Sequence, residues 1–393
     1  MEEVFVIDAV RTPIGRLGGS LKTVPATDLG AVAIGALYKN LSLDPDHIEE
    51  VIMGNALPAG LGQGPGRQAA LRAGLKNTTS SCTINKAGAS GMRAVMFASQ
   101  QIRTGDSRVL VAGGMESMSN VPHYSTEARY GTLLGHTRLQ DGIIRDGLWE
   151  VFKNRYLGNE VEHCARTHRI TRQQQDAFAI ESHRRAAQAH DQRAFESEIA
   201  TVKVRSRKGQ VDVISRDEET VRFDPDRVRK LQPLYEKDGT VTSANASTLG
   251  DGAAALLLAD GHRAGKLGLQ PVARLVSQAN AAQAPEWFTT SPAKAVNLAL
   301  ERAGKNISDM DLIEINENFA VVGLINTELL DINPSIVNVH GGAIGLGHPL
   351  GTSGARILVT LIHALRRYNK KWGCAAVCNG GGGASAIVVE CLA

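Results

Sequence analysis

Three polar clusters in the second half of the chain carry residue types suited to proton transfer and to holding a carbonyl oxygen. Asn316 follows a short apolar run, His348 lies in a glycine-rich stretch at 340–351, and Cys378 precedes four glycines. Histidine and cysteine can move protons, and an amide can hold a water or an oxygen. A strand cap, a glycine turn and a buried core thiol are the structural alternatives. The glycines around His348 let the backbone approach a ligand closely, which favours function there.

Each cluster follows a predicted strand, and α/β sheets place their sites at such strand ends. Apolar runs alternate with helical patterns on either side of a polar middle, which favours a largely parallel sheet covered on both faces. Thr171 and Gln174 have capping-box spacing, so we expect an amphipathic surface helix over 171–200. The segment at 203–238 is basic and loop-like. Strands are expected at 4–9, 50–54, 108–112, 253–258, 312–315 and 375–378, and further helices at 26–40, 88–103, 293–303 and 351–367.

The chain also contains a weak internal repeat. Ser90-Gly91 opens a helix that leads to an apolar strand ending in Gly-Gly, and Ser353-Gly354 does the same in the second half. Both dipeptides are common, so chance is the alternative. The matching order of helix, strand and glycines favours duplication, hence two similar halves.

Composition excludes several classes of protein. With 393 residues, 43% of them hydrophobic, the chain can form two or three compact units. The net charge of +3 is spread along the chain without a long basic run, which argues against a nucleic-acid partner. No apolar stretch of about 18 residues and no signal-peptide pattern occur, so we expect no membrane span. Five irregularly spaced cysteines are typical of reduced thiols, and a cytoplasmic location is predicted.

Together these motifs resemble the thiolase family, in its acetyl-CoA acetyltransferase branch, over essentially the whole chain. The resemblance implies an α/β thiolase fold of two similar βαβαβαββ halves in an α-β-α-β-α layered arrangement, plus an inserted loop domain. We expect the first part of the N-terminal half at 1–118, the loop domain with the end of that half at 119–243, and the C-terminal half at 244–393. The motifs that carry the resemblance are at 10–15, 113–119, 245–247, 316–317, 341–349 and 378–383.

The resemblance implies Claisen condensation of two acetyl-CoA to acetoacetyl-CoA, or the reverse thiolysis, with no metal or other cofactor. His348 matches the residue that activates the nucleophilic thiol, and Cys378 the one that moves the α-carbon proton. Asn316 matches the residue that holds a water in the enolate oxyanion hole. Gly380 and the nucleophile position match the backbone N–H donors of the other oxyanion hole, where preorganised donors stabilise developing charge.

The resemblance also implies where CoA and other subunits bind. Ser247 should touch the pantetheine arm and Arg222 should lie near the nucleotide end, although a solvated surface is the alternative for any one basic residue there. The loop at 121–146 resembles the one that joins dimers into tetramers, so a homotetramer is predicted; a lid folded on its own domain is the alternative. The further predicted binding residues are Leu148, Leu157 and Phe319.

The chain departs from the family at the nucleophile. The family stretch N-K-x-C-x-S-G is N-K-A-G-A-S-G here, and Gly88 cannot form an acyl-enzyme. Cys82 lies upstream on a predicted strand and lacks the helix N-terminus that lowers a thiol pKa. Further departures are Tyr156-Leu157, Thr248 and Asn318, which stands beside Phe319 where the family has a small residue.

Two origins of Gly88 stay open: a deliberate substitution that traps a bound state, and a natural loss in a remodelled relative. The function predicted is an acyltransferase of the thiolase class with impaired turnover. The alternative is a degenerate CoA-thioester-binding protein, or one with altered, non-covalent enolate chemistry. A purely structural subunit would leave the polar site at His348 and Cys378 unexplained.

Overall fold

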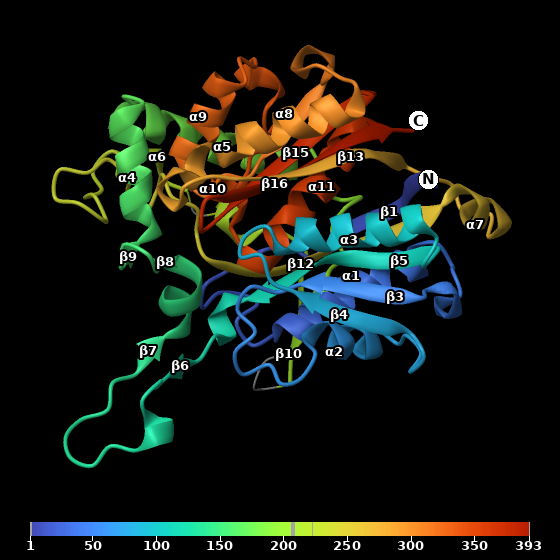
Figure 1. The fold of residues 1–393 in the computed structure, drawn as a ribbon, viewed down its shortest axis with the longest axis horizontal. Coiled ribbons are helices and arrows are strands. Elements are labelled where there is room, and N and C mark those ends of the chain that lie inside the picture. Colours follow the sequence, from blue (N-terminus) through green and yellow to red (C-terminus); the bar gives the residue numbers. More distant parts are fainter. Residues whose placement is uncertain (1, 206–208, 222, 393) are drawn as a thin grey trace.

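The structure is a computed structural model that describes residues 2–205, 209–221 and 223–392. Ten of the described strands join edge to edge in one mixed sheet (Figure 1). Its first half runs in the order β4 (Ser80–Ile84), β3 (Glu50–Gly54), β5 (Val109–Ser117), β12 (Gly250–Asp260) and β1 (Val4–Arg11). Its second half continues with β13 (Ala273–Ala282), β16 (Gly383–Cys391), β15 (Trp372–Asn379) and β14 (Leu312–Ile315), and β2 (Gly15–Arg16) pairs with β12.

The two halves of the sheet share one arrangement. In the first half, α3 (Ser90–Thr104) leads into β5, which is parallel to β3 and antiparallel to β12. In the second half, α11 (Leu350–Arg367) leads into β15, which is parallel to β14 and antiparallel to β16. The predicted duplication is confirmed by this topology.

The prediction of a largely parallel sheet was wrong. Strands β1, β5, β12, β13, β15 and β16 are joined by antiparallel ladders, and only β3–β4, β3–β5 and β14–β15 are parallel. Every residue of β12 is buried, as is every residue of β5. A strand covered on both faces is apolar throughout whatever its direction, so the continuous apolar pattern reported burial and not strand direction.

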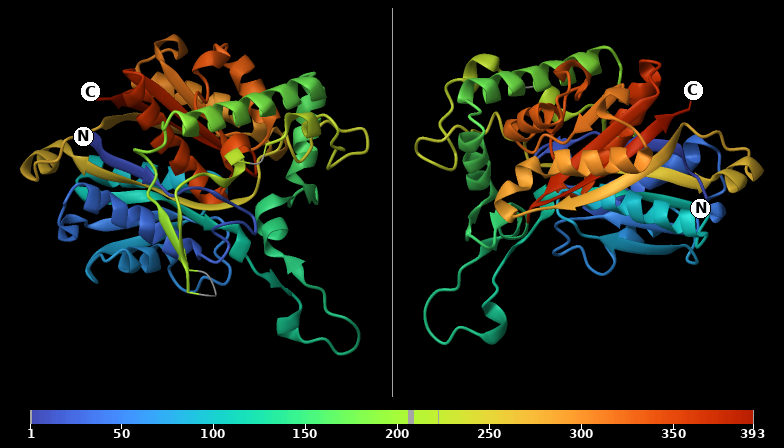
Figure 2. Two further views of the ribbon diagram at one scale, coloured as in Figure 1. Left: turned by 180° about the vertical axis from the view of Figure 1, so that it is seen from behind. Right: turned by 45° about the horizontal axis from the view of Figure 1, so that its top comes forward.

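Helices cover both outer faces of the sheet and fill the space between its halves (Figure 2). Helices α1 (Ala26–Asn40) and α2 (Pro65–Arg72) pack on the first half, α3 and α11 lie between the halves, and α8 (Ser291–Ala303) and α9 (Ala320–Leu329) cover the second. This is the predicted α-β-α-β-α order. Every residue of α11 from Leu350 to Leu365 is buried, so its polar side chains, such as Arg356 and His363, are buried with it.

The polar middle of the chain contains α4 (Leu157–Thr167) and α5 (Arg172–Asp191). The capping box predicted for α5 is confirmed: the Thr171 side chain accepts from the Gln174 backbone, and the Gln174 side chain accepts from the Thr171 N–H. The helix ends at Asp191, short of the predicted residue 200. The shorter elements are α6 (Pro225–Val228), α7 (Gly261–Lys266), α10 (Ala343–Leu346), β8 (Trp149–Glu150) and β9 (Arg155–Tyr156).

The segment at 203–238 was predicted to be loop-like, and among its described residues this is correct only in part. It contains most of a hairpin of β10 (Val202–Arg205) and β11 (Val211–Ile214), and then α6. Val202 is 1% exposed and packs with the first-half core, so the V-K-V-R sequence is the alternation of a half-buried strand. Further on, the Asp217 carboxylate forms a buried bidentate ion pair with Arg11 at 2.7 and 2.9 Å, which attaches the segment to β1.

The loop at 121–146 extends away from the body of the molecule, at the lower left of Figure 1. The short strands β6 (His123–Tyr124) and β7 (Gln140–Asp141) pair at its base. Tyr130, Leu133 and Leu134 beyond them are 91%, 108% and 97% exposed. Among the described residues, no helix has the length and apolar character needed to cross a membrane.

Candidate active site

The residues predicted to do chemistry lie where strand ends meet the N-termini of two central helices. Because β14 and β15 are parallel neighbours, Asn316 and Cys378 come to the same edge of the sheet, and the Asn316 backbone N–H donates to Ala376 at 2.9 Å. Gly88 and His348 each lie two residues before a central helix, α3 and α11, and these helices pack together. The two similar halves of the fold thus bring together four residues that are distant in the sequence: Gly88, Asn316, His348 and Cys378.

A cavity of about 450 Å³ opens beside these residues, a size typical of small-molecule sites. Asn316 and Cys378 are fully buried behind the cavity wall. Each forms a hydrogen bond with the side chain of Asn318, which lines the cavity. Arg222, one predicted binding residue, lies outside the described residues. All the other predicted site residues line the cavity: Gly88, His348, Gly380, Leu148, Leu157, Ser247 and Phe319.

His348 is held by hydrogen bonds at both ring nitrogens. Its Nδ1 lies 2.6 Å from Oγ of Ser353, and its Nε2 lies 3.0 Å from Nδ2 of Asn318. Burial disfavours the imidazolium, and the charge of Arg356 adds to this, so the pKa of His348 is lowered to about 3. The ring is therefore neutral at pH 7, because this pKa lies below the near-neutral pKa of an ordinary histidine.

Two of the glycines around the site have no room for a side chain. Gly347, directly before His348, has φ +109°, and a Cβ there would lie 2.7 Å from Ile14. Gly382, in the turn after Cys378, has φ +86°, and a Cβ there would lie 2.1 Å from the carbonyl of Gln283. Both left-handed conformations favour glycine, and they set the direction in which the chain enters and leaves the site.

Cys378 is a buried thiol that points at Asn318. Its Sγ donates to Oδ1 of Asn318 at 3.1 Å, and burial raises its pKa to about 12. Cys374, on the same strand, is also fully buried, and its pKa is likewise raised to about 12. Burial alone therefore does not distinguish the two thiols; the contact with Asn318 at the cavity wall does.

Gly88 faces the centre of this group. A Cβ built there would lie 3.3 Å from the Cys378 carbonyl and 3.8 Å from both Cε1 of His348 and Nδ2 of Asn318. A side chain at this position would therefore point into the space between the His348 ring, the Asn318 carboxamide and the backbone carbonyl of Cys378. Cys82 lies on β4 and is not among the described residues that line the cavity. Burial, with the charge of Glu50, raises the pKa of Cys82, so the thiolate is not favoured there.

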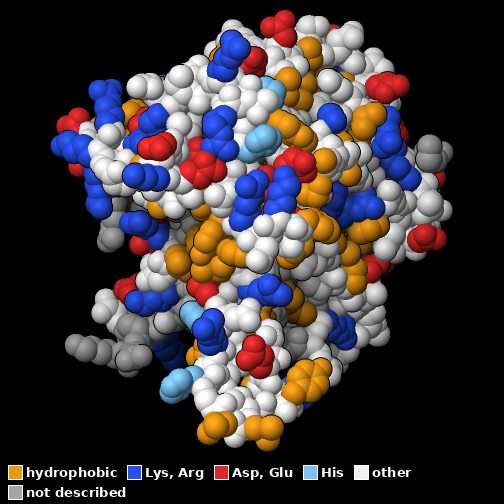
Figure 3. Space-filling view, turned by 60° about the vertical axis from the view of Figure 1, so that its left-hand side comes forward, with side chains coloured by type: hydrophobic (Ala, Val, Ile, Leu, Met, Phe, Trp, Pro, Cys, Tyr) orange, Lys and Arg blue, Asp and Glu red, His pale blue; other side chains and the backbone are white. Residues whose placement is uncertain are grey.

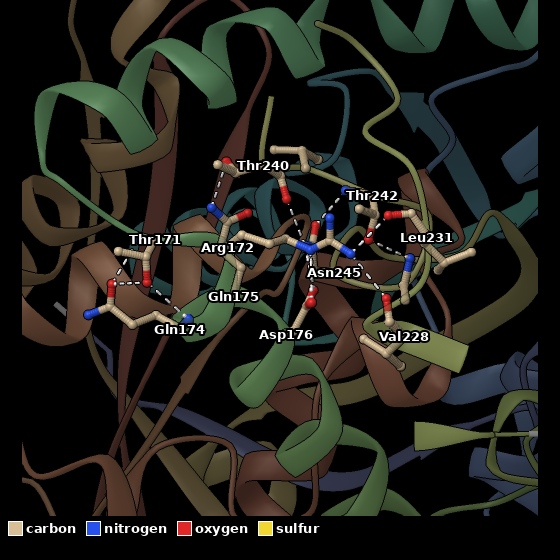
Figure 4. A network of polar contacts seen from close by, with 12 residues as sticks. Thr171, Arg172, Gln174, Gln175, Asp176, Val228, Leu231, Thr240, Thr242 and Asn245 are labelled. Atoms are coloured by element: carbon tan, nitrogen blue, oxygen red, sulfur yellow. Dashed lines mark hydrogen bonds and ion pairs between the residues drawn. The ribbon is translucent and has the colours of Figure 1, made fainter. Parts of the chain in front are cut away.

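The segment at 245–247 is anchored from two sides. Asn245 donates to Asp176 of α5 and to the carbonyl of Thr240, both at 3.0 Å (Figure 4). Ser247 donates to the Asn318 carbonyl from its N–H at 3.0 Å and from its hydroxyl at 2.9 Å. The motif thereby connects the capped end of α5 to the loop that carries Asn318.

Sequence reasoning assigned no role to three residues that contact the predicted catalytic set. Asn318 was noted only as a departure from the family, yet it contacts Asn316, His348 and Cys378. Ser353 bonds His348, and Arg356 donates to Asn316 at 3.4 Å. Ser353 belongs to the repeated Ser-Gly pair at the start of α11, and Arg356 lies three residues further along that helix, so the repeat was the signal that could have found them.

This fold and this site define a thiolase. The Thiolase, N-terminal domain family matches residues 4–262, and the Thiolase, C-terminal domain family matches residues 269–391. The chain belongs to the thiolase family. Strand β12 lies within the first of these matches and pairs with β1 and β5; the division of the chain at residues 118 and 243 stays a prediction.

Relatives with the same length and fold support the branch within the family. Acetyl-CoA acetyltransferase 2 of Arabidopsis thaliana is 50% identical over 392 residues, covering 99% of this chain and 97% of the relative. The Acat5 thiolase of Ascaris suum, solved in complex with coenzyme A, is 42% identical with a TM-score of 0.94 over 100% of both chains. The acetyl-CoA acetyltransferase of Bacillus anthracis is 37% identical with a TM-score of 0.97 over 100% of this chain and 99% of that one.

Proposed function

We propose that this chain binds CoA thioesters in the cavity at Gly88 and is an acetyl-CoA acetyltransferase-type thiolase whose turnover is impaired. The observation that carries the proposal is the position of Gly88. A side chain there would stand between His348, Asn318 and Cys378, where an acyl group would be held. The names of the relatives, and the coenzyme A bound to the Ascaris protein, support acetyl-CoA, acetoacetyl-CoA and CoA as ligands.

In the reaction proposed, a thiolate would attack the keto carbon of acetoacetyl-CoA and release the enolate of acetyl-CoA. Cys378 would protonate that enolate, and the thiol of a second CoA would then take the acetyl group from the enzyme. Gly88 supplies no thiolate, so the first step has no covalent route at this position. The groups that serve the enolate, Cys378, Asn316 and His348, are all present. Condensation and thiolysis share these steps, and the direction used by the cell is left open.

The second candidate is a CoA-thioester binder, or an enzyme with non-covalent enolate chemistry. It is favoured by one observation: Asn318 fills the space among the three polar residues with hydrogen bonds. An assay of acetoacetyl-CoA thiolysis by this chain and by Gly88→Cys, paired with titration of both with CoA, separates the candidates. Binding with thiolysis recovered in Gly88→Cys favours the first, binding without that recovery favours the second, and no binding contradicts both.

We predict that Ser247 and Arg222 both contribute to CoA binding. Ser247 lines the cavity, and Arg222 is placed near the nucleotide end by the family resemblance alone. We expect Ser247→Ala and Arg222→Ala each to weaken CoA binding several-fold, with only the Arg222 effect shrinking in high salt, because salt screens the attraction between a guanidinium and phosphate groups. Calorimetric titration at two salt concentrations measures this. Ser42→Ala, at an exposed site after α1, is the matched control. Unchanged CoA affinity in both variants would contradict the assignment.

We also propose a homotetramer joined through the loop at 121–146. Hydrophobic side chains gather at the far end of the loop, at the bottom of Figure 3, and the exposed apolar residues of the loop are Tyr130, Leu133, Leu134 and Leu139. Such exposed apolar groups usually contact a partner surface. Light scattering should report a tetramer for the unmodified chain and a dimer for Leu133→Asp/Leu134→Asp. Leu329→Asp, at an exposed leucine on α9, should leave the tetramer intact. A stable monomer in the unmodified chain would contradict this proposal.

A cytoplasmic location is also part of the proposal. It rests on the cysteine pattern, which is typical of reduced thiols. One relative at 47% identity, from Xenopus tropicalis, is named as mitochondrial, so location varies within the family.

A further inference from the structure

The side chain of Asn318 lies at the centre of the candidate active site. Its Nδ2 lies 3.0 Å from Nε2 of His348. Its Oδ1 accepts from Nδ2 of Asn316 at 2.8 Å and from the Cys378 thiol at 3.1 Å. One carboxamide therefore bridges the three residues that would otherwise serve the substrate. The backbone carbonyl of Asn318 is held by the two bonds from Ser247, so the loop that carries it is fixed.

These hydrogen bonds form a chain from Arg356 to Ser353, and the groups at its two ends determine which atom donates in each bond. At one end Arg356, which can only donate, gives a hydrogen to Oδ1 of Asn316. Nδ2 of Asn316 is then the donor to Oδ1 of Asn318, and Nδ2 of Asn318 is the donor to His348. At the other end the Ser353 hydroxyl donates to the Pro349 carbonyl at 3.0 Å, which can only accept. The Ser353 oxygen is thus left to accept from His348.

The tautomer of His348 follows from this order. Nε2 accepts from Asn318, and Nδ1 carries the hydrogen that Ser353 accepts. Arg356 is the charged group beside the ring, and its charge disfavours a second proton there. The lone pair that could take a proton from a group at residue 88 is therefore already engaged by Asn318.

Asn318 also faces the space at Gly88. Its Nδ2 lies 3.8 Å from the position a Cβ would take there. A carboxamide nitrogen has two hydrogens, and the bond to His348 uses one of them. Gly88 has no thiol that could give a proton to His348. Asn318 donates a hydrogen bond to Nε2 of His348, the nitrogen that would accept such a proton. The two residues are complementary parts of one altered site.

We propose that Asn318 is a positioning residue that holds His348 as the Nδ1–H tautomer with Nε2 engaged, and that its second Nδ2 hydrogen is donated to the thioester oxygen of a CoA ester bound at Gly88. The second part rests on the proposed function, because it needs a CoA thioester in this cavity. The first part concerns only the chain itself. Two experiments separate them.

The first experiment measures how reactive a thiol becomes at residue 88. Gly88→Cys and Gly88→Cys/Asn318→Ala are alkylated with iodoacetamide at pH 7, and modification of the peptide that contains residue 88 is followed by mass spectrometry. Removing Asn318 frees Nε2 of His348 to accept the thiol proton, which favours the thiolate. We expect the alkylation rate to rise at least about tenfold. Asn40→Ala, at an exposed asparagine at the end of α1, is the matched control and should leave the rate unchanged. Equal rates with and without Asn318 would overturn the first part.

The second experiment compares acetyl-CoA with CoA, which lacks the thioester oxygen. Asn318→Ala should weaken acetyl-CoA binding about tenfold, as expected for one lost hydrogen bond in a buried site, and leave CoA binding unchanged. Equal loss for both ligands, or no loss for either, would overturn the donor role. If neither ligand binds the unmodified chain, the proposed function and the donor role fall together, and the alkylation rates still decide the tautomer.

Discussion

Gly88→Cys is expected to raise the rate of acetoacetyl-CoA thiolysis at least about a hundredfold above that of the unmodified chain. The Cβ of the introduced cysteine would lie 3.3 Å from the Cys378 carbonyl oxygen and 3.8 Å from Cε1 of His348, at the N-terminal side of α3. A helix N-terminus and a neutral histidine both favour a thiolate. Without a nucleophile, only the donors around the substrate remain to lower the barrier, so the unmodified chain should be near background.

Two controls make this result specific. Gly88→Ala fills the same space without a thiol and should stay at background. Gly88→Cys/Asn318→Ala should exceed Gly88→Cys if Asn318 restrains His348. Substantial thiolysis by the unmodified chain would mean that another group, such as Cys82, serves as the nucleophile.

The unmodified chain is expected to exchange the methyl protons of acetyl-CoA with deuterated solvent, although slowly. The enolate half of the site does not need the missing thiol, since Cys378 can take the α-proton as a thiolate and amide donors can stabilise the enolate oxygen. Because burial raises the pKa of Cys378 to about 12, the thiolate is rare at pH 7, and the rate should rise with pH up to the limit of protein stability. Deuterium in recovered acetyl-CoA is measured by mass spectrometry.

A matched pair of cysteines tests the origin of this exchange. Cys378→Ala should abolish it, and Asn316→Ala should weaken it. Cys374→Ala removes an equally buried thiol from the same strand and should have no effect. A rate equal to that in the absence of protein would mean that the site is not assembled for proton transfer, and the binder candidate would then lead.

Continuity of apolar residues between turn residues made several elements predictable. The predicted ranges 26–40, 50–54 and 312–315 coincide with α1, β3 and β14. Strand β4 was expected only as the strand that carries Cys82, without bounds, because at the edge of the sheet its S-S-C-T-I sequence is partly exposed and carries little apolar signal. Strand direction could not be predicted either, since burial on both faces makes β12 apolar regardless of its neighbours.

The candidate site was predictable as a set of residues but not as a set of contacts. Asn316 and Cys378 could be brought together because they follow neighbouring strands, and Gly88 and His348 because both precede repeated helices. The contacts of Asn318 depend on the direction of one side chain between two loops. Neither periodicity nor spacing carries that information.

Intact-mass analysis after incubation with acetoacetyl-CoA tests most directly whether the site lacks a covalent nucleophile but is otherwise assembled. The unmodified chain should gain no acetyl group, whereas Gly88→Cys should gain one, located by peptide mapping on the peptide that contains residue 88. An acetyl group on the unmodified chain, at Cys82, Cys378 or elsewhere, would contradict the account. So would a Gly88→Cys chain that stays unacetylated, because His348 and Cys378 would then not be arranged to use the thiol.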